Sequence, residues 1–251
     1  MNKPLRITLI ATAALSLATL VNFAPMASLR LPGMREYTFS GMTVIAMPFD
    51  RPEAERIAAR IAKQSASVSE ALGTADTDSI GVIIYPDRKD LHRKTIGLAG
   101  ALLPNWFIGD NTRSYVLITS PAAPGPSHDR GSIERAAVHE YIHVLTDRRN
   151  KQLGYWLKEG IALYLAGQIP SPSSVRSYAD LSWEEFSRPN ALQFAELGGY
   201  SLAYTFIEYL REHYGWDAVV GLTAPDATFD AVLGCGEREL YDRWIAAVRE
   251  L

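Results

Sequence analysis

The sequence predicts an α+β fold, with a small amino-terminal sheet lobe packed on a mainly helical carboxy-terminal lobe. Short β-branched and aromatic runs occur before about residue 120, whereas apolar residues at helical spacing dominate the rest of the chain. The 251 residues are 47% hydrophobic and 21% charged, which is enough to bury one substantial core. We therefore expect one globular domain over residues 30–251, preceded by a leader at 1–29.

The overall charge and the cysteine content exclude several classes of protein. The 25 basic residues nearly balance the 28 acidic ones, so nothing favours nucleic acid as a partner. The single cysteine, Cys235, excludes an internal disulfide and a four-cysteine zinc site. It lies between Gly234 and Gly236, and we interpret it as a structural residue near a turn.

The amino terminus has the layout of a targeting segment. Lys3 and Arg6 precede an uncharged apolar run from Ile7 to Ala24, and these positive charges predict that residues 30–251 face outward. The run is longer than the core of most signal peptides, and the cleavage site at 24–27 is imperfect. A cleaved signal peptide and an uncleaved membrane anchor both remain open, and either places the protein on the periplasmic or extracellular side.

The first elements after the leader follow from local patterns. Two β-rich stretches, Tyr37–Phe39 and Met42–Ala46, are separated by Ser40-Gly41 and predict a hairpin. Asp50 then caps a helix whose apolar stripe ends near Gly73. The run Ile80–Tyr85 predicts a buried strand.

Less regular segments follow this strand. We expect His92 to be solvated on a short polar helix. The stretch Gly97–Ile108, a turn at 109–111 and the stretch Tyr115–Thr119 indicate a second hairpin. Residues 121–129 then form a proline-rich loop.

The pattern His-Glu-x-x-His lies on the next predicted helix, for which Ser132 is the expected cap. His139 and His143 are four residues apart, so their imidazoles project from one face and can converge on a single zinc ion. Glu140 beside them is suited to take a proton from a metal-activated water. The rest of the helix is almost entirely apolar, so these polar groups need a metal, a cleft or one another as partners.

A third ligand is expected on the following helix. Residues 150–154 form a turn, and the apolar run Trp156–Leu165 after it contains Glu159. The midpoint between His143 and Glu159 is residue 151, inside that turn, so an antiparallel helix pair places both side chains at the same height. Two histidines and one glutamate leave a fourth position open for water, which is the ligand set of a catalytic zinc site.

The carboxy-terminal part is predicted to be helical after a loop at 168–180. Ser182 begins a capping box that opens a short helix. Four further helices are expected at Tyr200–His213, Asp217–Leu222, Thr228–Leu233 and Glu237–Val248. We interpret the tryptophans of this part as core residues, namely Trp183, Trp216 and Trp244.

The sequence His139-Glu140-Tyr141-Ile142-His143, followed sixteen positions later by Glu159-Gly160-Ile161-Ala162, resembles the gluzincin metallopeptidases. The likeness is strongest to small bacterial peptidase-MA-like domains, and aminopeptidase N and thermolysin are more distant relatives. It covers residues from about 80 to 251 and rests on the combined motif. Thermolysin-like enzymes carry an aspartate where this chain has Leu163, so the resemblance does not say which group orients the histidines.

The resemblance implies a zincin-like fold and two further features of the site. Residues 101–107 lie where gluzincins carry the strand edge that binds extended peptide by strand addition, but we favour ordinary sheet structure there and leave the binding edge as the alternative. Tyr200, followed by Ser201-Leu202-Ala203, lies where aminopeptidase-N-like enzymes carry Tyr-x-Lys-Gly, whose tyrosine donates to the tetrahedral intermediate. Ala203 matches the small residue but no lysine is present, so Tyr204 and plain core packing remain alternatives.

These observations predict a zinc-dependent metallopeptidase acting on peptide or protein substrates. His139, His143 and Glu159 would hold Zn²⁺, Glu140 would act as general base, and Tyr200 would stabilise the oxyanion. Two other readings stay open: a zinc hydrolase of a non-peptide envelope amide or ester, and a non-catalytic envelope module that retains the fold.

Overall fold

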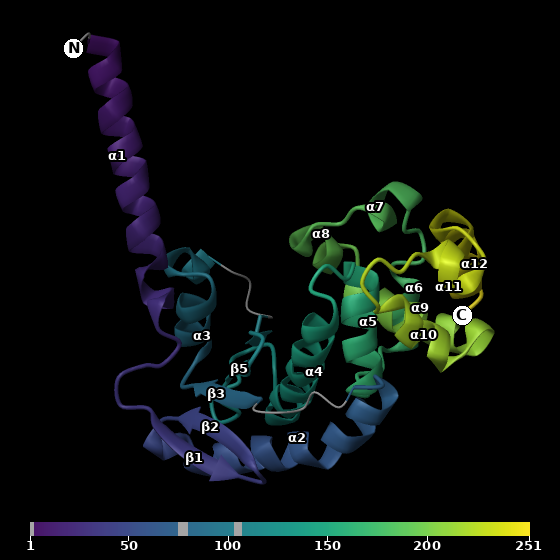
Figure 1. Ribbon diagram of the computed structural model, residues 1–251, viewed down its shortest axis with the longest axis horizontal. Coiled ribbons are helices and arrows are strands. Elements are labelled where there is room, and N and C mark those ends of the chain that lie inside the picture. The colour runs from purple at the N-terminus through teal and green to yellow at the C-terminus, as the bar shows by residue number, and fades with distance from the viewer. Residues whose placement is uncertain (1–2, 75–79, 103–106) are drawn as a thin grey trace. The chain divides into compact units, whose positions relative to one another are not determined.

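The computed structural model describes residues 3–74, 80–102 and 107–251. These residues form an α+β structure with a five-stranded mixed sheet in the amino-terminal half and helices in the carboxy-terminal part (Figure 1), as the sequence predicted. The chain divides into two compact units. The first comprises Met1–Ala59, Gly81–Asp110 and Tyr115–Ala137, and the second comprises Arg60–Ile80, Asn111–Ser114 and Val138–Leu251.

The sheet has the strand order β1-β2-β3-β5-β4. The predicted first hairpin is confirmed, because β1 (Arg35–Phe39) pairs antiparallel with β2 (Met42–Ala46). β3 (Gly81–Tyr85) is parallel to β2 and to β5 (Tyr115–Thr119), and it is buried throughout. β4 (Gly109–Asn111) is the neighbour of β5 at one edge.

The turn of the first hairpin has the backbone conformation that its sequence, Ser40-Gly41, favours. Ser40 has a φ of 51° and Gly41 a φ of 78°, so both central residues adopt the left-handed conformation of a two-residue hairpin. The helix α2 (Arg51–Ala71) follows, as predicted.

One core cluster gathers on a single face of the sheet. Ile45 lies opposite Ile83, and Ile83 lies opposite Leu117, so the three side chains project to the same side. Tyr85 is two residues beyond Ile83 and joins them, and Leu91 covers the group from α3 (Arg88–Thr95). This face is therefore apolar across three adjacent strands.

The expectation that His92 is solvated is wrong. The helix α3 forms as predicted, but His92 is buried on it. Its Nδ1 lies 3.1 Å from the carbonyl oxygen of Gly100 and its Nε2 lies 2.9 Å from that of Phe107. Both partners are backbone carbonyls that follow α3 in the chain, and no periodic pattern reveals them.

The predicted second hairpin is only half correct. Its second strand is β5, but Leu98–Leu102 forms a short 3₁₀-helix, η3, where the first strand was expected. The actual edge strand β4 occupies the residues that were assigned to the turn. Of the strand edge expected at 101–107, residues 103–106 lie outside the described part of the chain.

The helix that carries the His-Glu-x-x-His pattern begins earlier than predicted, because Asp129 and not Ser132 acts as its cap. The carboxylate of Asp129 accepts a hydrogen bond from the backbone N–H of Ser132 at 2.6 Å, and the Ser132 hydroxyl accepts from the Asp129 N–H at 2.9 Å. This reciprocal pair is a capping box. Hydrogen bonds from the backbone and the side chain of Ser132 lower the pKa of the Asp129 carboxyl.

Helices make up most of the chain from residue 130 onward. The predicted helices are confirmed within two residues at nearly every end, apart from this earlier start. The prediction of a loop over 168–180 is wrong in part, because Ser171 caps a short helix in which Pro172 occupies the first turn. The helices are α4 (Arg130–Arg149), α5 (Tyr155–Leu165), α6 (Pro172–Arg176), α7 (Trp183–Ser187), α8 (Ala191–Glu196), α9 (Gly199–Tyr214), α10 (Trp216–Leu222), α11 (Phe229–Leu233) and α12 (Glu237–Arg249).

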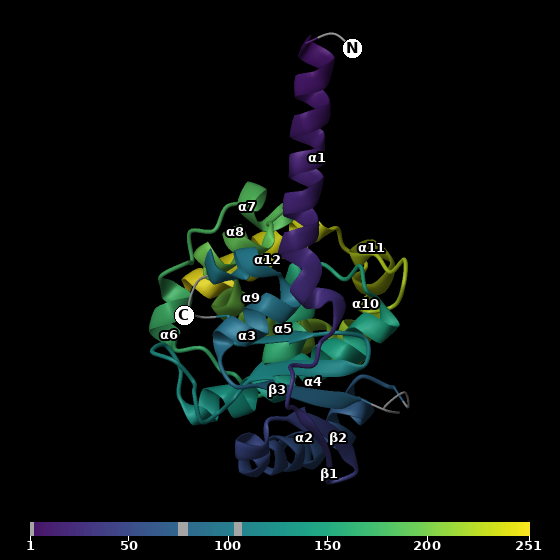
Figure 2. The same cartoon turned by 90° about the vertical axis from the view of Figure 1, so that its left-hand side faces the viewer.

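The apolar leader forms the helix α1 (Lys3–Phe23), which continues into the 3₁₀-turn η1 (Ala24–Ala27). Figure 1 and Figure 2 show α1 as one uninterrupted helix that runs away from α3. By length and composition, the segment Leu5–Ala27 is able to cross a membrane.

Candidate metal centre

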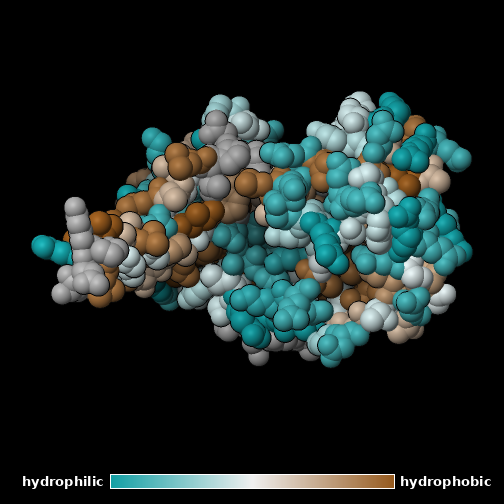
Figure 3. Space-filling view, turned by 90° about the horizontal axis from the view of Figure 1, so that it is seen from above, coloured by the Kyte–Doolittle hydropathy of each residue, from teal (hydrophilic) through white to brown (hydrophobic). Residues whose placement is uncertain are grey.

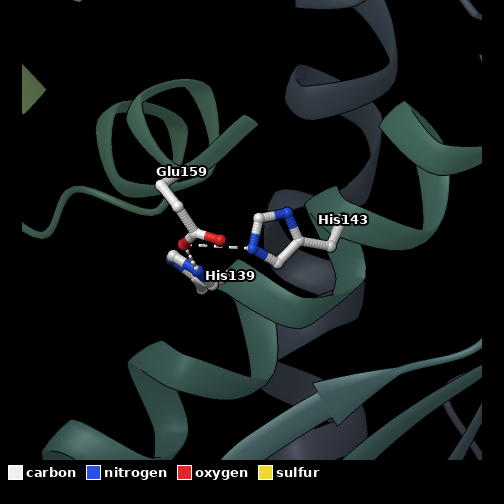
Figure 4. A group of neighbouring side chains, drawn as sticks. All are labelled: His139, His143 and Glu159. Carbon is white, nitrogen blue, oxygen red and sulfur yellow. Dashed lines mark hydrogen bonds and ion pairs between the residues drawn. The ribbon is translucent and has the colours of Figure 1, made fainter. Parts of the chain in front are cut away.

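The helices α4 and α5 bring together the three predicted metal ligands (Figure 4), which all belong to the second unit. His139 and His143 project from one face of α4, and Glu159 reaches them from α5. One nitrogen of each imidazole and one carboxylate oxygen lie within 4.8 Å of one another. Both histidines are buried. The hairpin therefore places Glu159 level with the histidine pair, as its spacing predicted.

The distances within this cluster suit a tetrahedral ion. The Oε2 of Glu159 lies 3.2 Å from the Nε2 of His139 and 3.4 Å from the Nε2 of His143. Ligands at 2.0 to 2.1 Å from a tetrahedral zinc ion are separated from each other by about 3.3 to 3.4 Å. The two imidazole planes are perpendicular, with centroids 4.5 Å apart, so both ring edges point at the same oxygen. The two distances from the carboxylate oxygen to the imidazole nitrogens thus match the separation of zinc ligands.

The tautomer of His139 strengthens this interpretation. Its Nδ1 lies 3.0 Å from the side-chain Oε1 of Gln168, and an amide oxygen only accepts hydrogen bonds. His139 therefore donates through Nδ1, and in the neutral ring Nε2 presents a lone pair to the Glu159 carboxylate. Two acceptors 3.2 Å apart repel each other unless a proton or a cation lies between them. A metal ion would satisfy both atoms at once.

The electrostatics favour the protonation states that metal binding needs. Burial, more than any other influence, lowers the pKa of His143, which keeps its imidazole neutral. Burial alone would raise the pKa of Glu159, but the interactions of its carboxylate with His143 and His139 outweigh that effect and hold the pKa well below its usual range. Neutral imidazoles and an ionised carboxylate are the ligand forms that bind zinc.

Two contacts fix α5, and Glu159 with it, within the second unit. The ammonium of Lys158 forms an ion pair with Asp147 of α4 at 2.7 Å. On the other side of α5, a Cβ at Gly160 would lie 2.5 Å from the carbonyl oxygen of Ala203 in α9. Only glycine permits this close backbone approach. Gly160, which directly follows Glu159, therefore sets the spacing between α5 and α9.

The close approach of α5 and α9 also accounts for the position of Tyr200, which lies one helical turn before Ala203. Gly198 precedes it in the left-handed conformation with a φ of 68°. A Cβ at Gly198 would lie 2.1 Å from the ring of Tyr178, so this position also requires glycine. The start of α9 is thereby held in one conformation.

The structure separates the two candidate tyrosines. Tyr200 is 36% exposed, and partial burial followed by the negative charges of Glu159 and Glu140 raises the pKa of its hydroxyl. Tyr204 is buried against the ring of Tyr164, and burial, followed by the negative charge of Glu208, raises the pKa of its hydroxyl. Tyr200 therefore belongs to the surroundings of the metal cluster, whereas Tyr204 belongs to the core.

Glu140 lies next to the cluster without being part of the convergent group. It follows His139 on α4 and is 9% exposed. Its negative charge acts on the Tyr200 hydroxyl together with that of Glu159. Glu140 and Glu159 therefore both act electrostatically on the Tyr200 hydroxyl.

Sequence reasoning missed Gln168. This residue lies nine positions after Glu159, beyond the end of α5, where composition indicated only a loop. Its side-chain oxygen faces the Nδ1 of His139, a partner that the sequence left unassigned. In the described parts of the chain, the buried Nδ1 of His143 has no hydrogen-bond partner. No pattern in the sequence could have identified Gln168, because its role depends on where the chain returns after α5.

Comparisons with known proteins found no matching family model, no matching curated protein and no matching solved structure.

Proposed function

We propose that this protein is a zinc-dependent metallopeptidase of the gluzincin type. The observation that carries the proposal is the convergence of the two Nε2 atoms of His139 and His143 on the Oε2 of Glu159. The hydrogen bond from His139 Nδ1 to Gln168 supports it, because that bond turns the Nε2 lone pair toward the shared point.

The composition of the ligand set favours a catalytic site over a structural one. Structural zinc sites are closed by four protein ligands, most of them cysteines, whereas this chain has one cysteine, Cys235, outside the cluster. Two histidines and one glutamate are the three protein ligands of many zinc hydrolases. A zinc ion held by them supplies Lewis acidity, which polarises a substrate carbonyl and lowers the pKa of a water molecule to about 7.

The residues of the chain divide the remaining work of peptide hydrolysis. Glu140 takes the proton of the attacking water and then delivers it to the leaving amine. Tyr200 donates a hydrogen bond to the carbonyl oxygen as that oxygen becomes negative. Because its pKa is raised, the Tyr200 hydroxyl stays protonated at neutral pH and remains a donor.

Metal analysis combined with peptide-library profiling tests this proposal. We expect the purified full chain to contain about one zinc per molecule and to cleave a subset of the peptides. Glu140→Gln is the matched control, since the amide has nearly the same volume but cannot accept the proton. It should retain zinc, and its rate of hydrolysis should be about 10²- to 10⁴-fold lower than that of the wild type.

Each outcome points to a different part of the proposal. A chain without zinc would refute the metal site. A zinc-containing chain that hydrolyses only non-peptide amides or esters would refute peptides as the substrate class. Equal hydrolysis by the wild type and Glu140→Gln would refute the assigned base.

A further inference from the structure

The helix α1 is apolar and exposed along most of its length, up to its last turn at Asn22. Its candidate membrane span, Leu5–Ala27, has 23 residues, or about 35 Å of helix, which exceeds the roughly 30 Å of bilayer hydrocarbon. None of that span is buried against the described residues of the protein. Figure 3 shows hydrophobic side chains, in brown, along α1 at the left of the view. Such a surface needs lipid around it.

The carboxy end of α1 is attached to the fold of the first unit. The side-chain oxygen of Asn22, in the last turn of α1, accepts a hydrogen bond from the backbone N–H of Ala99 in η3 at 2.8 Å. Gly97, with a φ of +95°, lies so close that a Cβ there would be 2.3 Å from the carbonyl oxygen of Asn22. This contact therefore requires both the asparagine and the glycine.

The segment after α1 is also part of this unit. The ammonium of Lys94 donates to the carbonyl oxygens of Pro25 at 2.9 Å and Ser28 at 2.7 Å. The Tyr85 hydroxyl donates to the carbonyl oxygen of Leu29 at 2.8 Å. Three apolar side chains of the segment pack against the core cluster of the sheet, namely Leu29, Leu31 and Met34. The chain from residue 22 to residue 34 is thus continuous with the fold.

These contacts bear on the fate of the leader. Cleavage at the candidate site within 24–27 would separate Asn22 from the protein and leave Ala99 and Gly97 without their partner. A segment destined for removal has no need of specific contacts with the folded unit. We propose that α1 is retained as a membrane anchor, and that η3 beside its foot rests on the bilayer with Leu98 and Leu102 inserted in the lipid.

The depth of η3 follows from the length of α1. Asn22 is 17 residues beyond the start of the candidate span, or about 26 Å along the helix. This places it near the outer limit of the hydrocarbon, where headgroups begin. η3 is bonded to Asn22 at that level and carries two strongly exposed leucines, Leu98 at 47% and Leu102 at 89%. Continuity with the spanning helix identifies the bilayer as their partner, independently of the proposed hydrolase activity.

The first test is the amino terminus of the exported protein. The full chain is expressed with its own leader, and the membrane fraction is analysed by intact mass and amino-terminal sequencing. We expect a chain that starts at residue 1 or 2 and resists extraction by alkaline carbonate. A chain that starts after residue 24, or one released by carbonate, would overturn the retained anchor.

The second test measures the insertion of η3. An environment-sensitive fluorophore is attached to Leu98→Cys or Leu102→Cys in a Cys235→Ser background, in vesicles of phosphatidylcholine and phosphatidylglycerol. We expect blue-shifted emission and quenching by spin-labelled lipid. Phe49→Cys is the matched control, because Phe49 is 68% exposed in the same unit but lies between β2 and α2, and its label should report water. Water-like emission from both η3 positions would refute the insertion.

The third test asks whether the foot of α1 holds η3 in place. Gly97→Ala inserts a methyl group against Asn22, whereas Gly41→Ala imposes the same strain of a positive φ with nothing within 4 Å. We expect Gly97→Ala to abolish most of the lipid quenching at position 102, and Gly41→Ala to leave it unchanged. A second label, at Leu15→Cys in α1, should stay quenched in both. Undiminished quenching at position 102 in Gly97→Ala would refute the attachment.

Discussion

Buried histidines occur in both units, and their surroundings differ in kind. In the first unit, the two ring nitrogens of His92 each face a backbone carbonyl oxygen, from Gly100 and Phe107. In the second unit, His139 and His143 turn one nitrogen each toward the same carboxylate oxygen of Glu159. The contacts with the two carbonyl oxygens connect α3 to the chain that follows it, whereas the Glu159 carboxylate brings three donor atoms together. Burial alone therefore does not distinguish the histidines of the two units, whereas the convergence of donor atoms does.

The same contrast holds for the buried carboxylates. Asp50 in the first unit accepts a hydrogen bond from the Ser120 hydroxyl at 2.6 Å, and Glu53 pairs with Arg130 at 2.6 Å. Each of these pairs joins two elements within that unit. Glu159 instead places a single oxygen 3.2 Å from the Nε2 of His139 and 3.4 Å from the Nε2 of His143. We interpret the first arrangement as structural and the second as a ligand set.

The sharpest way to break this comparison is to remove histidines from each unit. The double change His139→Ala, His143→Ala should abolish zinc binding, because it deletes two of three ligands. His92→Ala should retain zinc and lower the free energy of unfolding by about 1 to 3 kcal/mol, because it removes the buried imidazole that lies between the carbonyl oxygens of Gly100 and Phe107. Elemental analysis and thermal melts measure the two effects. Zinc retained in the double variant, or lost from a folded His92→Ala, would contradict the distinction.

A second comparison separates the two tyrosines of α9. Tyr200→Phe should lower kcat by about 10² to 10³ with little change in melting temperature, since this is the usual effect of deleting one oxyanion donor. Tyr204→Phe should leave kcat unchanged, because Tyr204 packs in the core beside Tyr164. The readouts are steady-state kinetics on the best profiled peptide and thermal unfolding. A normal rate in Tyr200→Phe would show that another group stabilises the oxyanion.

The role of Gln168 sharpens the comparison on the side of the metal cluster. Gln168→Ala should weaken zinc binding by about 10- to 100-fold, because His139 loses the acceptor that fixes its ring. Gln168→Glu should restore the affinity, since a carboxylate accepts the same Nδ1–H bond. Competition with a chromophoric chelator measures the dissociation constant without reference to activity. Equal affinity in Gln168→Ala and the wild type would exclude a positioning role.

The smallest expected effect concerns the spacing of α5 and α9. Gly160→Ala should lower the free energy of unfolding by about 1 to 3 kcal/mol, because its Cβ would lie 2.5 Å from the Ala203 carbonyl oxygen. The control is Gly131→Ala in the first turn of α4, where the new Cβ meets the flexible end of Arg135 at 3.3 Å and the Asp129 carboxylate at an ordinary contact distance of 3.5 Å. Urea denaturation measures both variants. Equal stabilities for Gly160→Ala and the wild type would mean that the helices are free to move apart.

The elements that the sequence predicted well are those with a local cause. The β1–β2 hairpin depends on two residues of positive φ between alternating strands, and the α4–α5 pair depends on helical periodicity around a short turn. The errors fell where a local pattern has more than one meaning. Serine and proline opened the helix α6 where they indicated a loop, and Asp129 capped α4 in place of Ser132.

The sequence by itself determined which residues form the candidate site. Helical geometry places His139 and His143 on one face, and the length of the turn sets the height of Glu159 opposite them. Only the tertiary structure decided what surrounds these residues. Gln168 reaches His139 across 29 positions, and the choice of Tyr200 over Tyr204 depends on how closely α9 approaches α5 at Gly160. A periodic pattern specifies the face of one helix, but hydrogen-bond partners and backbone spacing arise only when segments distant in the chain pack together.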